Sequence, residues 1–230
     1  MRTLRRVPWR VIPAWLAGNR LKILMYHSIS DNPFDRHAVS PTLFQEQMCF
    51  LRSKRVISLA EALSYLHAGC VLKNVYVITF DDALLDFYTH ALPVLRELNY
   101  PATIFVPTGL VGGAAVWDSC VPSKPLMTWE QMTECQRYQI SFGSHTVNHI
   151  RLTECTDDVA REELLISYKM LCDRFDTVIP ALAYPGGYYD SRVARLAQSA
   201  GYTCAFTASS RWGNGPETDL FRLRRQKFTL

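Results

Sequence analysis

Short apolar runs alternate with amphipathic runs along most of the chain. Val75–Phe80 is continuously apolar and rich in β-branched residues, which is typical of a strand covered on both faces. Helix-starting residues lie between such runs: Ser40 precedes Pro41, and Ser58 with Glu61 forms a capping box. The same pattern predicts further strands at Lys22–Tyr26, Thr103–Val106, Ile140–Gly143, Ala181–Tyr184 and Thr203–Phe206.

Repeated alternation of strand and helix implies parallel strands with helices outside them. For 230 residues, of which 48% are hydrophobic, we predict a single α/β domain: a closed or distorted (β/α) barrel, with an open doubly wound sheet as the alternative. Both folds place their chemistry at the C-terminal ends of strands. Residues 1–20 are interpreted as an N-terminal extension and 21–230 as the domain. Segment 107–127, rich in Gly, Pro and Ser, is predicted to be a long functional loop.

Charge and cysteine usage exclude several classes of protein. The net charge is +4, and arginines gather near both ends of the chain without a basic stripe of interleaved aromatics, so we expect no nucleic-acid partner. We expect the arginine-rich ends to be solvated, with contact to an anionic glycan or a membrane surface as the alternative. The seven cysteines form no C-x-x-C pair, which argues against a zinc ribbon and fits reduced, mostly buried thiols.

Targeting signals are equally sparse. No run reaches transmembrane length, and the early apolar stretch is interrupted by Pro8, Arg10 and Pro13, so no clear signal peptide forms. We therefore predict no transmembrane segment and a cytoplasmic location, with an N-terminus suited to lie on a membrane surface. The sequence makes no prediction of oligomeric state.

Three polar clusters follow three predicted strands: Thr79–Asp82, Ser144–His149 and Tyr184–Gly187. Each alone has an ordinary interpretation, as a helix cap, an incidental histidine pair or a turn. Together, two histidines and a carboxylate make a set that holds a divalent metal with open positions, and a second carboxylate can act as base. The sequence thus predicts metal-assisted hydrolysis, with backbone N–H groups of the Gly-rich turn near the oxyanion.

These residues resemble the polysaccharide deacetylase family, also called the NodB-homology or carbohydrate esterase family four. The specific signal is T-F-D-D at Thr79–Asp82 together with S-H-T-x-x-H at Ser144–His149. Leu24–His27, Pro101–Pro107 and Ala183–Gly187 also look like the family, and the similarity runs from about Leu21 to the C-terminus. The chain looks most like the subset of exopolysaccharide N-deacetylases.

The resemblance implies a distorted (β/α) barrel, with Asp81 as general base and Asp82, His145 and His149 as metal ligands. The implied cofactor is a divalent metal, commonly Zn2+, with Co2+ also functional. The implied substrate is an N-acetylhexosamine unit of a poly- or oligosaccharide, or of a lipid-linked precursor.

The sequence departs from the family pattern at four places. Ala83 replaces a usual glycine, which we expect to be tolerated if the position is helical. Ala183 stands where the family has an Arg that orients the base, and Gly186 where an aromatic residue supplies an oxyanion amide; the Gly186 amide can still serve. Arg225 ends a Leu-Arg-Arg run where the family has Leu-x-His, and is a candidate to supply the missing partner of Asp81. The general acid is then His27, water or the protonated base.

Several other residues are candidates for substrate contact. His27, Tyr184 and Trp212 are predicted to bind substrate. Trp117 and Trp129 are candidate sugar-stacking platforms, although Trp129 also suits core packing. Asp118 and Asn214 are candidates to contact hydroxyls, whereas His37, His67 and His90 have no partner in the sequence and receive no role.

Two other functions stay open at this stage. One is a non-catalytic carbohydrate-binding relative, favoured by the missing Arg and His but opposed by the complete set of two aspartates and two histidines. The other is an amidohydrolase of small non-sugar amides or esters.

Overall fold

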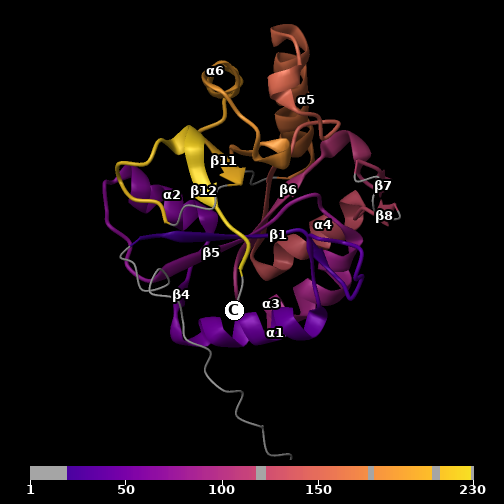
Figure 1. The fold of residues 1–230 in the computed structure, drawn as a ribbon, viewed down its shortest axis with the longest axis vertical. Coiled ribbons are helices and arrows are strands. Elements are labelled where there is room, and N and C mark those ends of the chain that lie inside the picture. Colours follow the sequence, from indigo (N-terminus) through magenta and orange to yellow (C-terminus); the bar gives the residue numbers. More distant parts are fainter. Residues whose placement is uncertain (1–19, 118–122, 176–178, 209–212, 229–230) are drawn as a thin grey trace, which may run out of the picture.

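An eight-stranded sheet runs through the middle of the molecule in the computed structural model, which describes residues 20–117, 123–175, 179–208 and 213–228 (Figure 1). Its strands follow the order β1-β5-β6-β9-β10-β11-β12 and pair in parallel, and β4 pairs with the first residues of β5. The strands are β1 (Lys22–Tyr26), β4 (Arg55–Val56), β5 (Val75–Phe80), β6 (Ala102–Val106), β9 (Ile140–Ser144), β10 (Ala181–Ala183), β11 (Cys204–Ala208) and β12 (Leu223–Arg225).

The sheet curls back until its last strand meets its first. Gln226, directly after β12, forms a parallel bridge with Leu24 of β1, and its backbone bonds Met25 and Ile23 at 2.9 and 3.1 Å. The contact between β9 and β10 is reduced to one register pair, Ser144 with Leu182. The fold is therefore a distorted (β/α) barrel, as predicted, and the alternative of an open doubly wound sheet is wrong.

In the described part of the chain, six α-helices pack against the sheet. Several of them start at the capping residues read from the sequence. Ser40, Ser58 and Asp190 each accept a hydrogen bond from the backbone three residues ahead, and Thr128 completes a capping box with Gln131. In Figure 1, α5 and α6 lie above the sheet and α1 and α3 below it. The helices are α1 (Pro41–Phe50), α2 (Leu59–His67), α3 (Leu92–Leu98, after a π-helical Phe87–Ala91), α4 (Trp129–Cys135), α5 (Asp157–Arg174) and α6 (Ser191–Ser199).

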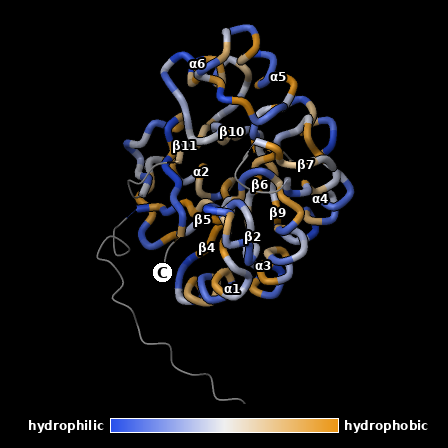
Figure 2. Tube along the Cα trace, turned by 45° about the vertical axis from the view of Figure 1, so that its right-hand side comes forward, coloured by the Kyte–Doolittle hydropathy of each residue, from blue (hydrophilic) through white to orange (hydrophobic). Residues whose placement is uncertain are grey.

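Alternation along the strands divides the core into an inner and an outer part. On β5, Val75 and Val77 face the barrel interior with Phe105, Phe206 and the apolar face of α2. Tyr76, Ile78 and Phe80 face outward and pack with residues of α1, α3 and α4. The central strands β5 and β6 consist mostly of apolar residues, whereas Figure 2 shows many hydrophilic stretches on the helices at the outside. Because both faces are covered, the strands read as continuous apolar runs.

The predicted long loop 107–127 carries short structure in its described part. Ala114–Ala115 (β7) and Lys124–Pro125 (β8) form an antiparallel pair, and Leu126 bridges Leu84. A second small pair is parallel, Ser28–Ile29 (β2) with Ala38–Val39 (β3). Single 3-10 turns complete the elements at Leu51–Ser53, Thr108–Leu110, Gln136–Tyr138, Leu152–Glu154, Pro185–Gly187 and Leu220–Arg222.

Two predictions from composition are corrected by the fold. The thiols are not mostly buried: of the six cysteines in the described ranges, Cys135 and Cys204 are buried, and Cys49, Cys70 and Cys172 are exposed. The C-terminal arginines are not all solvated, because Arg225 is 1% exposed. Within the described residues, none of the helices combines the length and apolar character needed to cross a membrane.

Candidate active site

The C-terminal ends of neighbouring strands bring the predicted polar clusters together. Asp81 and Asp82 follow β5, His145 follows β9, and Gly186 lies two residues beyond Tyr184 after β10. Chain reversal at these strand ends needs left-handed backbone, which Asp82 (φ 72°), Thr146 (φ 66°) and His149 (φ 55°) adopt. Such conformations cost about 1–2 kcal/mol each in non-glycine residues and gather at functional sites.

Ala83 shares this backbone conformation, with φ 53°. The expectation that the position is simply helical is therefore wrong: it lies in the left-handed region that glycine tolerates best. The Ala83 carbonyl accepts a hydrogen bond from Met127 N at 2.9 Å, so this backbone also anchors the end of segment 107–127.

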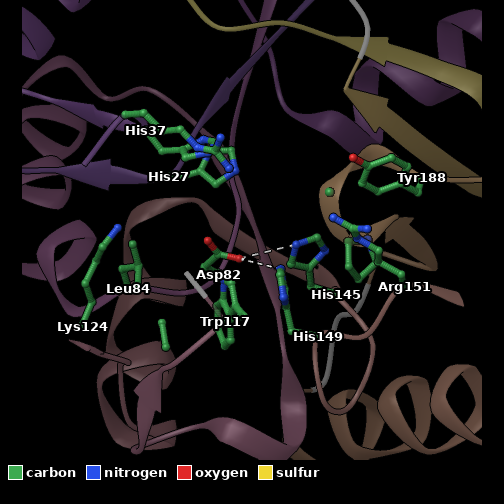
Figure 3. A pocket seen from close by; sticks show the side chains of 14 residues that line it. His27, His37, Asp82, Leu84, Trp117, Lys124, His145, His149, Arg151 and Tyr188 are labelled. Carbon is green, nitrogen blue, oxygen red and sulfur yellow. Dashed lines mark hydrogen bonds and ion pairs between the residues drawn. The ribbon is translucent and has the colours of Figure 1, made fainter. Parts of the chain in front are cut away.

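Asp82, His145 and His149 converge on one point. Asp82 Oδ1 lies 3.5 Å from His145 Nε2 and 3.3 Å from His149 Nε2, and all the candidate ligand atoms lie within 4.8 Å of one another (Figure 3). Ligands of a tetrahedral zinc ion stand about 3.4 Å apart, given bonds of roughly 2.1 Å. The three side chains therefore have the spacing of ligands to one divalent ion.

The protonation states also suit a metal. His145 Nδ1 lies 2.7 Å from the carbonyl oxygen of Ala183, which can only accept, so Nδ1 carries the proton and Nε2 offers its lone pair. Burial lowers the pKa of His145 to about 4, which keeps the ring neutral. Burial alone would raise the pKa of Asp82, but the nearby histidines lower it below its usual value. Asp82 Oδ1 is buried without a hydrogen-bond partner among the described residues, which a cation would satisfy.

Asp81 is held by Arg225 rather than by the ligand cluster. Arg225 Nη1 and Nη2 donate to the two carboxylate oxygens of Asp81 at 2.5 and 2.8 Å, and Nη1 also reaches Thr79 Oγ1 at 3.3 Å. The guanidinium lies over the rings of Phe105 and Phe206, 5.1 and 5.7 Å from their centroids. Burial would raise the pKa of Asp81, yet the charge of Arg225 lowers it overall, so the carboxylate stays ionised.

Helix α5 supports the histidine loop from behind. The buried Glu163 accepts hydrogen bonds from the backbone N–H groups of Val147 and Asn148 at 2.8 and 2.9 Å, and from the Asn148 side chain at 2.6 Å. One turn along, Ser167 Oγ donates to the Thr146 carbonyl at 3.1 Å and bonds Ser144 Oγ at 2.7 Å. These contacts fix the loop that carries both histidines, as second-sphere partners of metal ligands do.

A pocket of about 320 Å³ opens over the cluster (Figure 3). The predicted substrate contact His27 and the predicted oxyanion residue Gly186 border it, and His27 Nε2 lies 3.8 Å from Asp81 Oδ2. Trp117 stacks on the His149 ring, 4.0 Å between centroids, and so both lines the pocket and holds the His149 ring in place. The lining residues are His27, Arg36, His37, Asp82, Leu84, Ala115, Trp117, Lys124, His145, His149, Arg151, Pro185, Gly186 and Tyr188.

Three of the candidate substrate contacts do not line this pocket, and for Trp129 the alternative of core packing is the one found. Tyr184 points away from the pocket: it is fully buried on the outer side of β10, and its hydroxyl donates to the Phe221 carbonyl at 3.2 Å. Asn214 is buried and bonds the backbone of Arg224 in both directions, which is a structural role. Trp129 packs beside Phe175 in the outer core, 5.9 Å between ring centroids. Trp212 and Asp118 lie outside the described residues.

Five polar or aromatic residues that line the pocket were not among the predicted site residues. His37, which had been given no role, stacks on His27 with ring centroids 4.6 Å apart, and burial lowers its pKa to about 4. His90, which also has no predicted role, does not line the pocket; its Nδ1 lies 2.8 Å from the Ile29 carbonyl oxygen. The other missed lining residues are Arg36, Lys124, Arg151 and Tyr188, and only their position beside predicted loops could have pointed to them.

Comparison with known proteins agrees with this architecture. The family model for polysaccharide deacetylase matches residues 68–205. A Bacillus subtilis protein named for that family, YxkH, is 31% identical over 205 residues, covering 84% of this chain and 67% of that protein. The poly-beta-1,6-N-acetyl-D-glucosamine N-deacetylase of Staphylococcus aureus is 25% identical, covering 83% and 68%.

Solved structures give the same result. The Streptococcus pyogenes deacetylase PplD, determined in complex with acetate, superposes with a TM-score of 0.79 at 29% identity, covering 91% of this chain and 92% of that one. IcaB from Ammonifex degensii superposes with a TM-score of 0.81 at 25% identity, covering 92% and 93%.

Proposed function

The chain belongs to the polysaccharide deacetylase family, and we propose that it removes N-acetyl groups from N-acetylhexosamine units of a poly- or oligosaccharide by metal-dependent hydrolysis. The catalytic domain that we assign to this reaction spans residues 21–230. Water adds to the acetyl carbon, the carbon–nitrogen bond breaks, and acetate and a free amine leave. The observation that carries the proposal is the convergence of Asp82, His145 and His149 beside an ionised Asp81.

Asp82, His145 and His149 would hold the metal, with zinc the first choice for this donor set and cobalt an alternative. A divalent ion bound there supplies Lewis acidity, polarising the acetyl carbonyl and lowering the pKa of water toward about 7. The protein's part is to present a neutral His145, a charged Asp82 and a pocket that admits the acetylated sugar.

Asp81 is suited to take the proton from the attacking water. Both of its oxygens are fixed by Arg225, so the carboxylate cannot rotate toward the ligand cluster and replace Asp82 as ligand. Arg225 thus does for Asp81 what the family's orienting Arg does from the position that Ala183 occupies here. Arg225 lies in β12, the strand next to the point where the barrel closes onto β1, whereas Ala183 lies in β10.

Two further residues complete the proposed machinery. The backbone of Gly186 (φ 64°) borders the pocket, where its N–H can stabilise the oxyanion of the tetrahedral intermediate. A side chain at position 186 would contact the Tyr188 ring, since an added Cβ lies 2.8 Å from two ring carbons. His27 would give a proton to the departing amine, which is supported by its position at the pocket wall, 3.8 Å from Asp81.

The substrate class is supported by the relatives rather than by geometry alone. The Staphylococcus aureus relative is named for deacetylation of poly-beta-1,6-N-acetyl-D-glucosamine, and Trp117 offers an aromatic ring in the pocket wall of the kind that sugars stack on.

The proposal is tested by measuring the metal content of the purified chain and its release of acetate from N-acetylated oligosaccharides. We expect about one equivalent of metal, turnover that a chelator abolishes, and recovery with Zn2+ or Co2+. Bound metal without turnover on sugars would favour a carbohydrate-binding protein. Turnover of small non-sugar amides or esters alone would favour the other amidohydrolase.

A further inference from the structure

The pocket wall carries more positive than negative charge. Among the lining residues within the described ranges, Arg36, Lys124 and Arg151 are cationic, and Asp82 is the only carboxylate. Asp82 is also a proposed metal ligand, so its charge is directed at the ion. With a divalent ion bound, the excess of positive charge around the pocket becomes larger still.

The three cations come from separate segments. Arg36 lies in the turn before β3, Lys124 in β8, and Arg151 just after the histidine loop. Figure 3 shows Lys124 and Arg151 on opposite sides of the Asp82 cluster. The charges therefore flank the site where the acetyl group would react, and a bound glycan would pass between them.

Local partners leave much of this charge available. Arg36 is exposed, and its Nε donates to His37 Nε2 at 3.1 Å; it has no ion pair with a carboxylate in the described ranges. Arg151 pairs with Glu154 at 3.0 Å, but both side chains are more than half exposed, and such pairs contribute about 0–1 kcal/mol. Arg151 also lies over the Tyr188 ring, 4.4 Å from its centroid, which orients its guanidinium at the pocket wall. Lys124 is paired with the buried Asp35 and is the most neutralised of the three.

This arrangement does not suit a neutral glycan made only of N-acetylhexosamine. Deacetylation turns each neutral amide into an amine that is partly protonated near neutral pH, so a homopolymer gains positive charge as the reaction proceeds. A positive pocket repels such a product and gains nothing from the neutral starting polymer. It does attract a chain that carries negative charge close to the acetylated sugar.

We propose, resting on the proposed deacetylase function, that the physiological substrate is an anionic glycan whose negative group lies next to the acetylated sugar and is bound by Arg36 and Arg151. A carboxylate and a phosphate share the chemistry that a guanidinium recognises, two acceptor oxygens in one plane. The two arginines lie around the Asp82, His145 and His149 cluster, not within it. We therefore expect the anion to lie on a neighbouring sugar, not on the sugar that reacts.

The test compares three acetylated oligosaccharides of equal length. One contains only N-acetylglucosamine, one has a uronic acid beside the acetylated sugar, and one has a phosphate monoester there. We expect kcat/KM for acetate release to be about tenfold higher for at least one anionic substrate at low salt. The anionic-to-neutral ratio of kcat/KM should fall toward one in about 1 M NaCl, where the Debye length is roughly 3 Å. Whichever anionic substrate is favoured identifies the group.

Variants tie the preference to the two arginines. Arg36→Gln and Arg151→Gln should each lower the anionic-to-neutral ratio of kcat/KM several-fold. Arg96→Gln, the charge-matched control on the outer helix α3, should leave the ratio as it is. A wild-type ratio near one at low salt would overturn the inference, as would equal ratios in all three variants.

The outcome separates this inference from the function on which it rests. Acetate release from the neutral substrate without any anionic preference keeps the deacetylase and removes the anionic substrate. Absence of release from all three substrates contradicts the deacetylase. In that case, calorimetry measures the binding of the same oligosaccharides to the Asp81→Asn variant. Tighter binding of an anionic oligosaccharide supports an anion-binding subsite at Arg36 and Arg151, and equal binding of all three overturns it.

Discussion

Arg225 and Asp81 form a bidentate ion pair across 144 positions of sequence, with N–O distances of 2.5 and 2.8 Å. Both side chains are almost completely buried, 1% and 4% exposed. Their partnership joins the last strand of the barrel to the end of β5, where the proposed base and the proposed metal ligand are adjacent residues. The orientation of the proposed base therefore depends on closure of the barrel, because closure brings Arg225 beside Asp81.

Breaking this pair from one side should be costlier than removing it entirely. Arg225→Met leaves a buried carboxylate without its partner, which we expect to lower the free energy of unfolding by about 3–5 kcal/mol. Adding Asp81→Asn should recover part of that loss, because the second change removes the uncompensated charge. Urea unfolding of the two single variants and the double variant measures the coupling. Strict additivity would show that the pair is not formed in solution.

Replacing the proposed base and replacing a proposed metal ligand should affect metal content differently. Asp81→Asn removes a base and no ligand, so we expect kcat to fall at least about 100-fold while the metal content is unchanged. His145→Ala removes a ligand and should lose the metal. Elemental analysis alongside acetate release distinguishes the two. Loss of metal from Asp81→Asn would mean that the roles of the two aspartates are assigned the wrong way round.

Glu163 should affect metal binding without touching the metal. Glu163→Ala frees the backbone of Val147 and Asn148, and we expect metal affinity to fall by about 10–100-fold. Its neighbour Glu162 is exposed on the same helix and gives a matched control. Competition with a chromogenic chelator measures both affinities. If Glu162→Ala and Glu163→Ala weakened binding equally, the support of the loop by α5 would be refuted.

Ala83 gives a test of backbone strain. Replacing it with glycine relieves about 1–2 kcal/mol of left-handed strain, loses burial of one methyl group worth about 0.8 kcal/mol, and adds chain entropy of about 0.5–1 kcal/mol. The terms nearly cancel, so Ala83→Gly should change stability by less than about 1 kcal/mol.

A β-branched residue at the same place has no such compensation. Ala83→Val should destabilise by about 2–4 kcal/mol, from positive φ and from overpacking of a buried site. Thermal unfolding compares the two variants. A valine variant as stable as the glycine variant would show that this backbone relaxes out of the left-handed region.

Local patterns in the sequence were sufficient for most of the fold. The apolar run Val75–Phe80, the caps at Ser40 and Ser58, and the polar clusters directly after strands depend on neighbouring residues, so they can be read without coordinates. Parallel strands then place those clusters at one edge of the barrel, which is why Asp82 and the two histidines could be grouped across more than sixty positions.

The orientation and the partners of the site residues depend on contacts between distant segments, which only the tertiary structure shows. Alternation along β10 turns Tyr184 outward because Ala183 faces the barrel interior, and only the register of the sheet sets that choice. Segment packing brings Arg36, Lys124 and His37 to the pocket, and barrel closure through Gln226 carries Arg225 into the core beside Asp81. The sequence by itself determined which residue types could do the chemistry, since that is a property of side chains and local spacing. Their partners, charges and orientations were decided by the closed sheet, because burial and hydrogen bonding exist only once remote strands meet.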